Sequence, residues 1–503
     1  MRAPPSEVRR SLLSSNGVTF ILAAAGAVLR IWHYLSNRSL WIDEAMLATN
    51  ILKRPWAELA KPLDFLQAAP IGFLYLEKSV TLLLGPEEPA LRLIPLIAGL
   101  ASLVLFVSVA RRTLAGVAIP IAVGLFAFCG PLLYYSSEAK QYSSDVAIAL
   151  LLILLSLQTK DGGAWWPIAL TGSAAIWFSY PATFVVAGAG LTLLACELTN
   201  REPRRLIAGA AAAALCAASF VAAYFVSFRA TAGNPGWKDF WSSAFAPAPP
   251  RSLYDLLWFP RAARGLFTGP AGFDFPGLAI FAFVVGSAAC LAADRGRVAL
   301  LLSPIALALI ASGLHRYPFS GRLLLFCVPA LLLLVGEGSA RLLEATRGAA
   351  PVAGAALLAL LFLPLLLQAA RDLRHPGREE IKPVLDFVRR QRKPGDSFYV
   401  YHGARPAFDY YSPRYGFTAR DVTMGVAKSS DWNVYRADLD RLSRSGRTWV
   451  VFSHVTQSDV VDERSLFLHF LDDIGTRLDA SEAKGAAAYL YDLRRRGVAE
   501  NAR

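Results

Sequence analysis

Three short polar clusters with chemical potential lie between long apolar stretches of the sequence. The first spans residues 39–45 and carries adjacent carboxylates at Asp43 and Glu44. Adjacent acids beside an apolar stretch repel each other and resist desolvation, so they need a counter-charge or a chemical task. Two solvated loop acids are the simpler interpretation, and a pair of acids with a chemical task at a membrane face is the functional one.

The second cluster spans residues 134–142 and contains Tyr135, Glu138, Lys140 and Tyr142. A lysine next to a membrane can extend its amine to the headgroups, and tyrosines are common in interfacial belts. The same side chains can also belong to an active site at the membrane interface. The sequence leaves both interpretations open.

The third cluster spans residues 315–322 and contains His315, Arg316, Tyr317 and Arg322. Arginine binds phosphate through a planar, bidentate fork. Two arginines and a histidine on the outer side of a membrane go against the positive-inside bias. This cluster therefore predicts an anionic partner such as a lipid phosphate.

Membrane helices must position these clusters, because the composition is that of a polytopic membrane protein. Of 503 residues, 55% are hydrophobic and only 18% charged, against about 25% charged in soluble domains. This balance excludes a disordered, fibrous or disulfide-stapled chain. Eleven apolar segments approach the length that a ~30 Å hydrocarbon core requires. They lie near residues 17–35, 90–110, 116–135, 144–159, 164–180, 182–198, 206–227, 277–293, 298–314, 322–340 and 351–370.

A twelfth apolar segment, Ile71–Leu84, is too short to span and carries Glu77 and Lys78 near its middle, so we expect an interfacial helix. With eleven spans and a cytoplasmic N-terminus, the basic loops near residues 111, 160, 201–205, 295–297 and 341–347 all face the cytoplasm. A retained first span fits this orientation. The net charge of +13 then reflects topology, and no nucleic-acid partner is expected.

This topology divides the chain into a transmembrane domain, residues 1–370, and an extracytoplasmic domain, residues 371–503. The outer side then holds a first loop at residues 36–89 and a second large loop at 228–276. In the tail we expect helices at 379–392, 405–411 and 465–478 and strands at 397–401, 448–454 and 487–493, which is a small α/β domain. The spans contain almost no ionisable residues, which argues against an ion-coupled transporter.

The ordered motifs resemble those of the GT-C glycosyltransferase superfamily, which uses polyprenyl-phosphate sugars, and within it the protein mannosyltransferases and aminoarabinose lipid A transferases. The matching features are Leu40-Trp41-Ile42-Asp43-Glu44-Ala45, then residues 69–75 with Gly85, Glu88 and Arg92, then residues 134–142, and Tyr317-Pro318 with Gly321-Arg322. The likeness covers about residues 1–340. A lysine-proline pair of the aminoarabinose branch is absent, and Gln67-Ala68-Ala69-Pro70 stands in its place.

The resemblance implies an inverting membrane glycosyltransferase at the outer face of a bacterial inner membrane. It implies that Asp43 is the general base with Glu44 beside it, and that Lys140, Arg316, Arg322 and His315 bind the donor phosphate. Glu138, Tyr135, Tyr142 and Tyr317 would position the substrate. A divalent cation, Mg²⁺ or Mn²⁺, at Asp43, Glu44 and Glu138 is an open alternative that no ligand spacing demands.

The implied partners are a polyprenyl-phosphate sugar, an extracytoplasmic lipid, glycan or protein acceptor, and the bilayer. Two other functions remain open. A flippase or exporter of lipid-linked sugars would need a polar lining through the membrane, which the spans lack. A polymerase or ligase of lipid-linked oligosaccharides would use the outer arginines but would not need the Asp43-Glu44 pair.

Overall fold

The computed structural model describes residues 5–229, 234–348, 350–374, 377–417, 422–426, 432–442, 445–455 and 462–493, with the backbone alone for 5–14. The chain folds into two compact units. The first, here called the membrane unit, comprises Met1–Ser36 and Arg54–His375. The second, here called the sheet unit, comprises Asn37–Lys53 and Pro376–Arg503.

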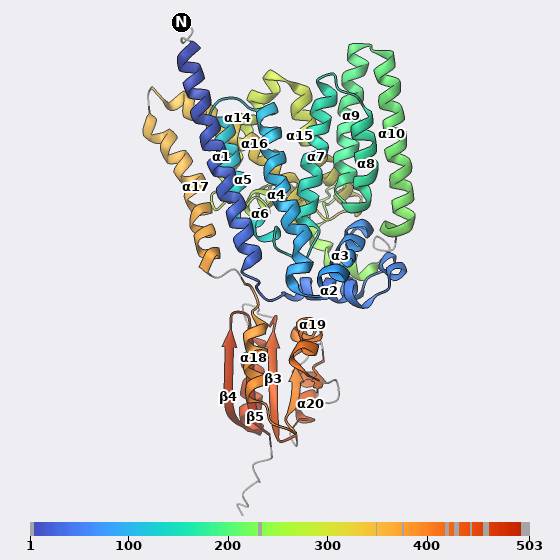
Figure 1. Ribbon diagram of the computed structural model, residues 1–503, viewed down its shortest axis with the longest axis vertical. Coiled ribbons are helices and arrows are strands. Elements are labelled where there is room, and N and C mark those ends of the chain that lie inside the picture. Colours follow the sequence, from blue (N-terminus) through green and yellow to red (C-terminus); the bar gives the residue numbers. More distant parts are fainter. Residues whose placement is uncertain are drawn as a thin grey trace, which may run out of the picture. The chain divides into compact units, whose positions relative to one another are not determined.

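The membrane unit is a bundle of apolar helices (Figure 1). Within the described residues, nine helices are long and apolar enough to cross a membrane. They are Ser15–Leu35 of α1, α4 (Glu88–Thr113), α7 (Tyr142–Lys160), α9 (Ala182–Asn200), α10 (Pro203–Ala223) with the turn to Phe228, α14 (Pro276–Ala293), α15 (Arg295–Gly313), Gly321–Thr346 with α16 (Val328–Thr346), and α17 (Pro351–Arg374). Two shorter apolar helices, α5 (Ala118–Phe128) and α8 (Trp166–Phe178), fall in the other two expected spans. The predicted polytopic helical membrane fold is confirmed.

Two expected spans are less regular than the sequence pattern suggested. The segment 116–135 is divided between α5 and α6 (Gly130–Tyr135), with Cys129 between them. Pro131 lies in the first turn of α6, where its missing N–H and fixed φ are tolerated. The segment 322–340 begins as a 3₁₀ helix, Gly321–Cys327, before α16. In contrast, the interfacial helix α3 has the predicted bounds, Ile71–Leu84.

Helix α16 forms the core of the membrane unit, because every residue from Val328 to Ala340 is buried. Glycines bring α14 against it: a Cβ on Gly286 would lie 1.9 Å from the carbonyl oxygen of Leu334. A Cβ on Gly338 would lie 1.8 Å from the carbonyl oxygen of Ala282. Small residues of this kind let membrane helices approach backbone to backbone.

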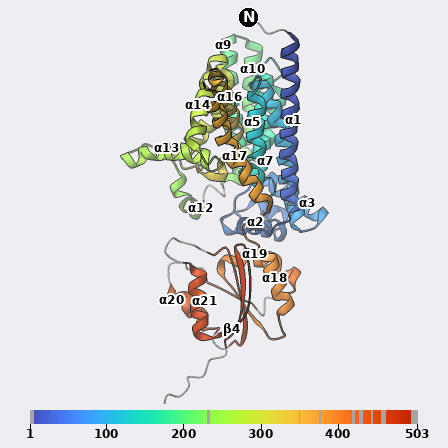
Figure 2. The same cartoon turned by 90° about the vertical axis from the view of Figure 1, so that its left-hand side faces the viewer.

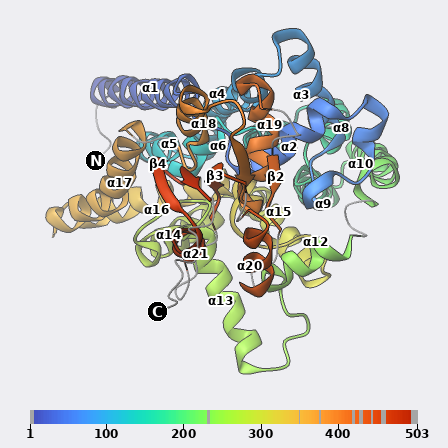
Figure 3. The same cartoon turned by 90° about the horizontal axis from the view of Figure 1, so that it is seen from below.

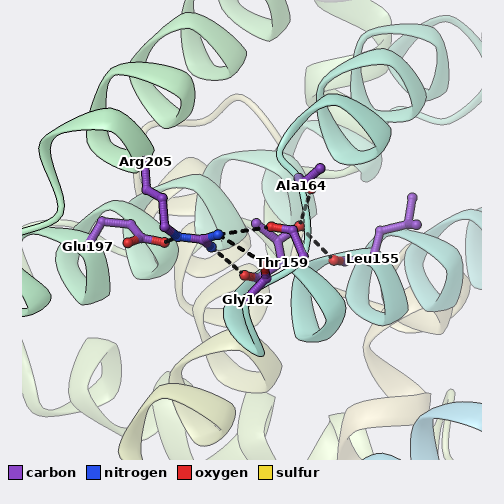
Figure 4. Close-up of polar contacts among 7 residues, drawn as sticks. Leu155, Thr159, Gly162, Ala164, Glu197 and Arg205 are labelled. Atoms are coloured by element: carbon purple, nitrogen blue, oxygen red, sulfur yellow. Dashed lines mark hydrogen bonds and ion pairs between the residues drawn. The ribbon is translucent and has the colours of Figure 1, made fainter.

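One end of the bundle, here called the basic end, is held together by ion pairs between helices. Lys160 at the end of α7 contacts Asp294 before α15, with Nζ 2.7 Å from Oδ2. Arg205 on α10 pairs with Glu197 at 2.8 Å and donates to the carbonyl oxygen of Thr159 at 2.7 Å (Figure 4). Arg205 therefore satisfies carbonyl groups at the C-terminus of α7, and Lys160 joins α7 to the start of α15.

The opposite end of the bundle, here called the site end, carries α3, α12 (Pro235–Phe240) and α13 (Leu253–Thr268). Figure 2 shows α13 running across the direction of the bundle helices, and Figure 3 shows it projecting away from them. The helix begins with a capping box in which Ser252 and Asp255 bond each other's backbone N–H groups. Loop 228–276 thus contains the two short helices α12 and α13.

The sheet unit contains a five-stranded sheet in the order β2-β1-β3-β5-β4. Strands β1, β2 and β3 are parallel, and β5 pairs antiparallel with both β3 and β4. Helix α18 (Ile381–Gln391) covers one face, and α20 (Trp432–Asp440) and α21 (Glu463–Ile474) lie over the other (Figure 2). The strands are Ser397–Val400, Val422–Met424, Arg447–Ser453, Thr476–Ala483 and Ala486–Asp492 for β1 to β5, and α19 is Arg405–Tyr415.

The tail prediction was right in class and wrong in four details. The expected helix 465–478 is too long, because α21 ends at Ile474 and β4 begins at Thr476. Strand β4 is largely exposed and polar, so its sequence lacks the alternation that marks a half-buried strand. The short strand β2 and helix α20 were also missed.

Candidate active site

The acidic part of the candidate site begins at α2 (Ile42–Lys53) in the sheet unit. Asp43 and Glu44 lie in the first turn, where the helix dipole stabilises negative charge. Glu44 is fully buried, and its Oε2 accepts a hydrogen bond from the backbone N–H of Trp41 at 3.4 Å, which is half of a capping box. Asp43 is half-buried. The two adjacent acids therefore have different environments: Glu44 caps the helix, and Asp43 is partly accessible.

Side chains of the C-terminal segment fix the loop that precedes α2. Oε2 of Glu380 accepts from both the N–H and the hydroxyl of Ser39, at 3.2 and 2.9 Å. The N–H of Leu40 donates to the hydroxyl oxygen of Tyr411 on α19 at 2.8 Å. Leu40 and Tyr411 are both fully buried. The segment 37–53 is thus an integral part of the sheet unit.

Two functional candidates in this part, Glu379 and His454, were missed in the sequence. Oε2 of Glu379 accepts from the N–H of Ile42, the first residue of α2, at 3.2 Å. Its Oε1 lies 2.5 Å from Nδ1 of His454. His454 directly follows β3, at the end of the strand predicted over residues 448–454. Its position at a carboxyl edge was therefore visible in the sequence, but its partner more than 70 residues away was not.

The cationic part of the candidate site lies in the membrane unit, in the turn between α6 and α7. Lys140 is 3% exposed, and its amine donates to Oε1 of Gln67. The neighbouring Gln141 donates to the carbonyl oxygen of Ala68 at 3.3 Å. The segment that lacks the lysine of the aminoarabinose branch is therefore the one that Lys140 contacts.

Aromatic rings connect the turn that carries Lys140 to the 3₁₀ helix Gly321–Cys327, which precedes α16. The rings of Tyr135 and Tyr142 are 5.1 Å apart in an edge-to-face arrangement. The guanidinium carbon of Arg322 lies 5.8 Å from the centre of the Tyr142 ring, within the range of a cation–π contact. Glu138, in the same turn, is fully buried. The structure thus brings Tyr135, Tyr142 and Arg322 together, although Arg322 is 180 residues away from Tyr142 in the sequence.

The three predicted site residues in the turn at residues 315–320 have different environments. The hydroxyl of Tyr317 donates to the carbonyl oxygen of Leu323 at 2.7 Å. Burial raises the pKa of Tyr317 far above its usual range, so this phenol stays a neutral donor. His315 and Arg316 are exposed, and the ring of His315 packs against Phe245 at 5.1 Å.

The alternative of a divalent cation at Asp43, Glu44 and Glu138 stays a prediction. Among the described residues, no group of three or more His, Cys, Asp or Glu side chains could hold a metal ion as they are placed. Glu44 already accepts the N–H of Trp41 at the start of α2. No chemical step below uses a metal ion.

An apolar cavity of about 500 Å³ lies between α8, α9 and α10. Its lining includes Ile176, Phe184 and Phe220, with Gly190 and Gly209 providing space. The ring of Phe184 also contacts the ring of Tyr317, with centroids 5.0 Å apart. The cavity therefore begins one aromatic ring away from the third polar cluster.

Comparison with known proteins gives a match in structure only. No protein-family model and no curated protein matches the sequence. The crystal structure of ArnT from Cupriavidus metallidurans in the apo state matches with 12% identity over 95% of this chain and 98% of that one, with a TM-score of 0.53. ArnT bound to undecaprenyl phosphate matches with 14% identity over 97% and 98% (TM-score 0.49). The apo oligosaccharyltransferase of Archaeoglobus fulgidus matches with 14% identity over 94% and 74% (TM-score 0.49). The chain thus has the fold of ArnT, and the GT-C resemblance drawn from the motifs is confirmed at the level of fold.

Proposed function

We propose that the protein is an inverting membrane glycosyltransferase that moves a sugar from a polyprenyl-phosphate donor to an extracytoplasmic lipid, glycan or protein. It would act in a bacterial inner membrane with its N-terminus in the cytoplasm and its sheet unit in the periplasm. The basic end of the bundle would then face the cytoplasm, in agreement with the positive-inside rule.

Asp43 serves as the general base of this reaction. The acceptor hydroxyl oxygen attacks the anomeric carbon while the bond from that carbon to the phosphate oxygen breaks. The polyprenyl phosphate leaves with the bonding electron pair, and the hydroxyl proton passes to the Asp43 carboxylate. The partial exposure of Asp43 supports this role, because a base must reach the acceptor. Glu44 supports the base by capping the first turn of α2.

Lys140 and Arg322 hold the donor phosphate and balance the negative charge that develops on it. Both come from the site end of the membrane unit, and a cation in a poorly hydrated place interacts more strongly than one in water. Tyr135, Tyr142 and Tyr317 line the same region and provide ring faces for a sugar. Arg316 and His315 are exposed and would guide the anionic donor as it approaches.

One observation carries this proposal: the third polar cluster contacts the lining of an apolar cavity that extends along α8, α9 and α10. Phe184 lines the cavity and contacts Tyr317, and Arg322 contacts Tyr142. A lipid-linked phosphate needs this combination, because its head is anionic and its isoprenoid tail is apolar.

Mass spectrometry of cell-envelope glycolipids and glycoproteins tests the proposal and identifies the sugar. Cells without the gene should lack one sugar modification, which the wild-type gene restores and Asp43→Asn does not. Glu58→Gln is the matched control, because Glu58 is a half-exposed acid of the same loop, and it should restore the sugar fully. Full restoration by Asp43→Asn, with the protein present in the membrane, would refute the assignment of the base.

A further inference from the structure

The sheet unit gathers four carboxylates around the first turn of α2. Asp43 and Glu44 belong to the turn itself, and Glu379 and Glu380 reach it from the segment before α18. The N–H of Glu380 donates to the carbonyl oxygen of Lys484 at 2.7 Å, so the second pair is anchored to the turn between β4 and β5. Like charges at such a density need a counter-charge.

His454 provides one such charge, and Lys382 and Arg378 also contact the loop before α2. It lies directly after β3 with a φ of 50°, a left-handed conformation that is uncommon for residues other than glycine. The hydrogen bond to Glu379 raises the pKa of His454 above its ordinary value of 6.5, burial opposes this change, and the negative charges of Glu379 and Asp43 add to it. His454 is therefore protonated to higher pH than a free histidine.

A second histidine faces His454 across the carboxyl edge of the sheet. His402 follows β1, which pairs in parallel with β3. Burial lowers the pKa of His402, the carboxylate of Glu463 opposes this, and the charge of His454 lowers the pKa further. Of the two imidazoles, His454 therefore takes up a proton first, and its charge is directed to the carboxylates of Glu379 and Asp43.

We propose that Glu379 and His454 are positioning residues for Asp43, an inference that rests on the proposed function of that residue. Glu379 holds two groups at once, the first N–H of α2 and the imidazole of His454. Protonated His454 places a positive charge near the Asp43 carboxylate and balances the acids around it. The C-terminal domain thus completes the active site from a distance in sequence. Transfer requires the protonated imidazole, so activity falls as pH rises through the pKa of His454.

The coupling can be measured without any substrate. The chain has six histidines, so imidazole resonances of isotope-labelled full-length protein in detergent can be titrated and assigned by substitution. Glu379→Gln should lower the pKa of His454 toward 6.5, and Asp43→Asn should lower it by a smaller amount. Glu380→Gln is the matched control, because Glu380 contacts Ser39, and it should leave the titration of His454 in place.

The functional arm follows the initial rate of sugar loss from endogenous lipid donors. Membranes from cells without the gene are incubated with purified protein between pH 5.5 and 8.5. Glu379→Gln should move the alkaline limb to lower pH, with the rate falling up to about tenfold per pH unit above the new pKa. His454→Asn can still donate to Glu379 but carries no charge, so it should lose at least tenfold in rate at pH 6 and show no alkaline limb.

The outcomes separate the inference from the function beneath it. If Asp43→Asn abolishes transfer and yet leaves the pKa of His454 unchanged, that result overturns the inference and leaves the proposed function standing. A wild-type rate and pH profile in His454→Asn overturns the inference as well. Full transfer by Asp43→Asn overturns both.

Discussion

The hydrogen bond from Leu40 to Tyr411 allows a quantitative test of how the loop before α2 is held. Tyr411→Phe keeps the ring and removes only the hydroxyl group, so it opens no large cavity. It leaves the N–H of Leu40 buried without its partner, since both residues are 0% exposed. An unsatisfied buried donor costs about 1–3 kcal/mol, which corresponds to roughly a 5- to 150-fold shift in the local opening equilibrium.

Hydrogen–deuterium exchange of peptides within residues 37–53 measures this shift directly, because the exchange of protected amides follows local opening. Tyr411→Phe should speed exchange in these peptides by the factor above and leave the peptides of α16 unchanged. Tyr415→Phe is the matched control on the same helix, since its hydroxyl donates to the carbonyl oxygen of Lys382 at 3.5 Å, outside residues 37–53. Equal exchange in the two variants would refute the idea that this bond holds the loop.

Two further predictions concern stability. Gly286→Ala places a Cβ 1.9 Å from the carbonyl oxygen of Leu334, about 1.4 Å short of an ordinary contact of ~3.3 Å, so it should cost about 1–3 kcal/mol. Its thermal midpoint in detergent should fall below that of Gly277→Ala, where a Cβ meets no atom within 4 Å, and equal midpoints would contradict the packing argument. In the sheet unit, burial would raise the pKa of Asp396, but the hydrogen bonds it accepts, first from Arg447, lower it instead. The stabilisation from the ionised Asp396 carboxylate is therefore present above its unfolded pKa and lost as pH falls through its folded pKa. Asp396→Asn should lower the thermal midpoint at pH 7, and its difference from wild type should shrink as pH falls below the unfolded pKa.

The sequence could predict whatever depends on local hydrophobicity. The length and central charges of Ile71–Leu84 distinguished an interfacial helix from a span, and the structure gives the same bounds. Strand β4 escaped detection because its exposed residues carry no burial pattern. Glu379 and His454 escaped for a different reason: their relation to α2 exists only after distant segments have packed. Lys140's contact with Gln67 and the Arg322–Tyr142 pair are further contacts of this non-local kind.

The discontinuous make-up of the sheet unit also sets the order in which the protein can mature. Ser39 and Glu380 are 341 positions apart, and a ribosome adding about 5–20 residues per second needs roughly 20–70 seconds to cover that distance. Throughout this time the segment with Asp43 has been synthesised, while the side chains that fix it have not. The bundle can insert and pack first, and the contacts that fix the Asp43 segment form only with the last quarter of the chain. A product truncated before residue 376 would therefore lack these contacts, and under the proposed function it would not transfer sugar.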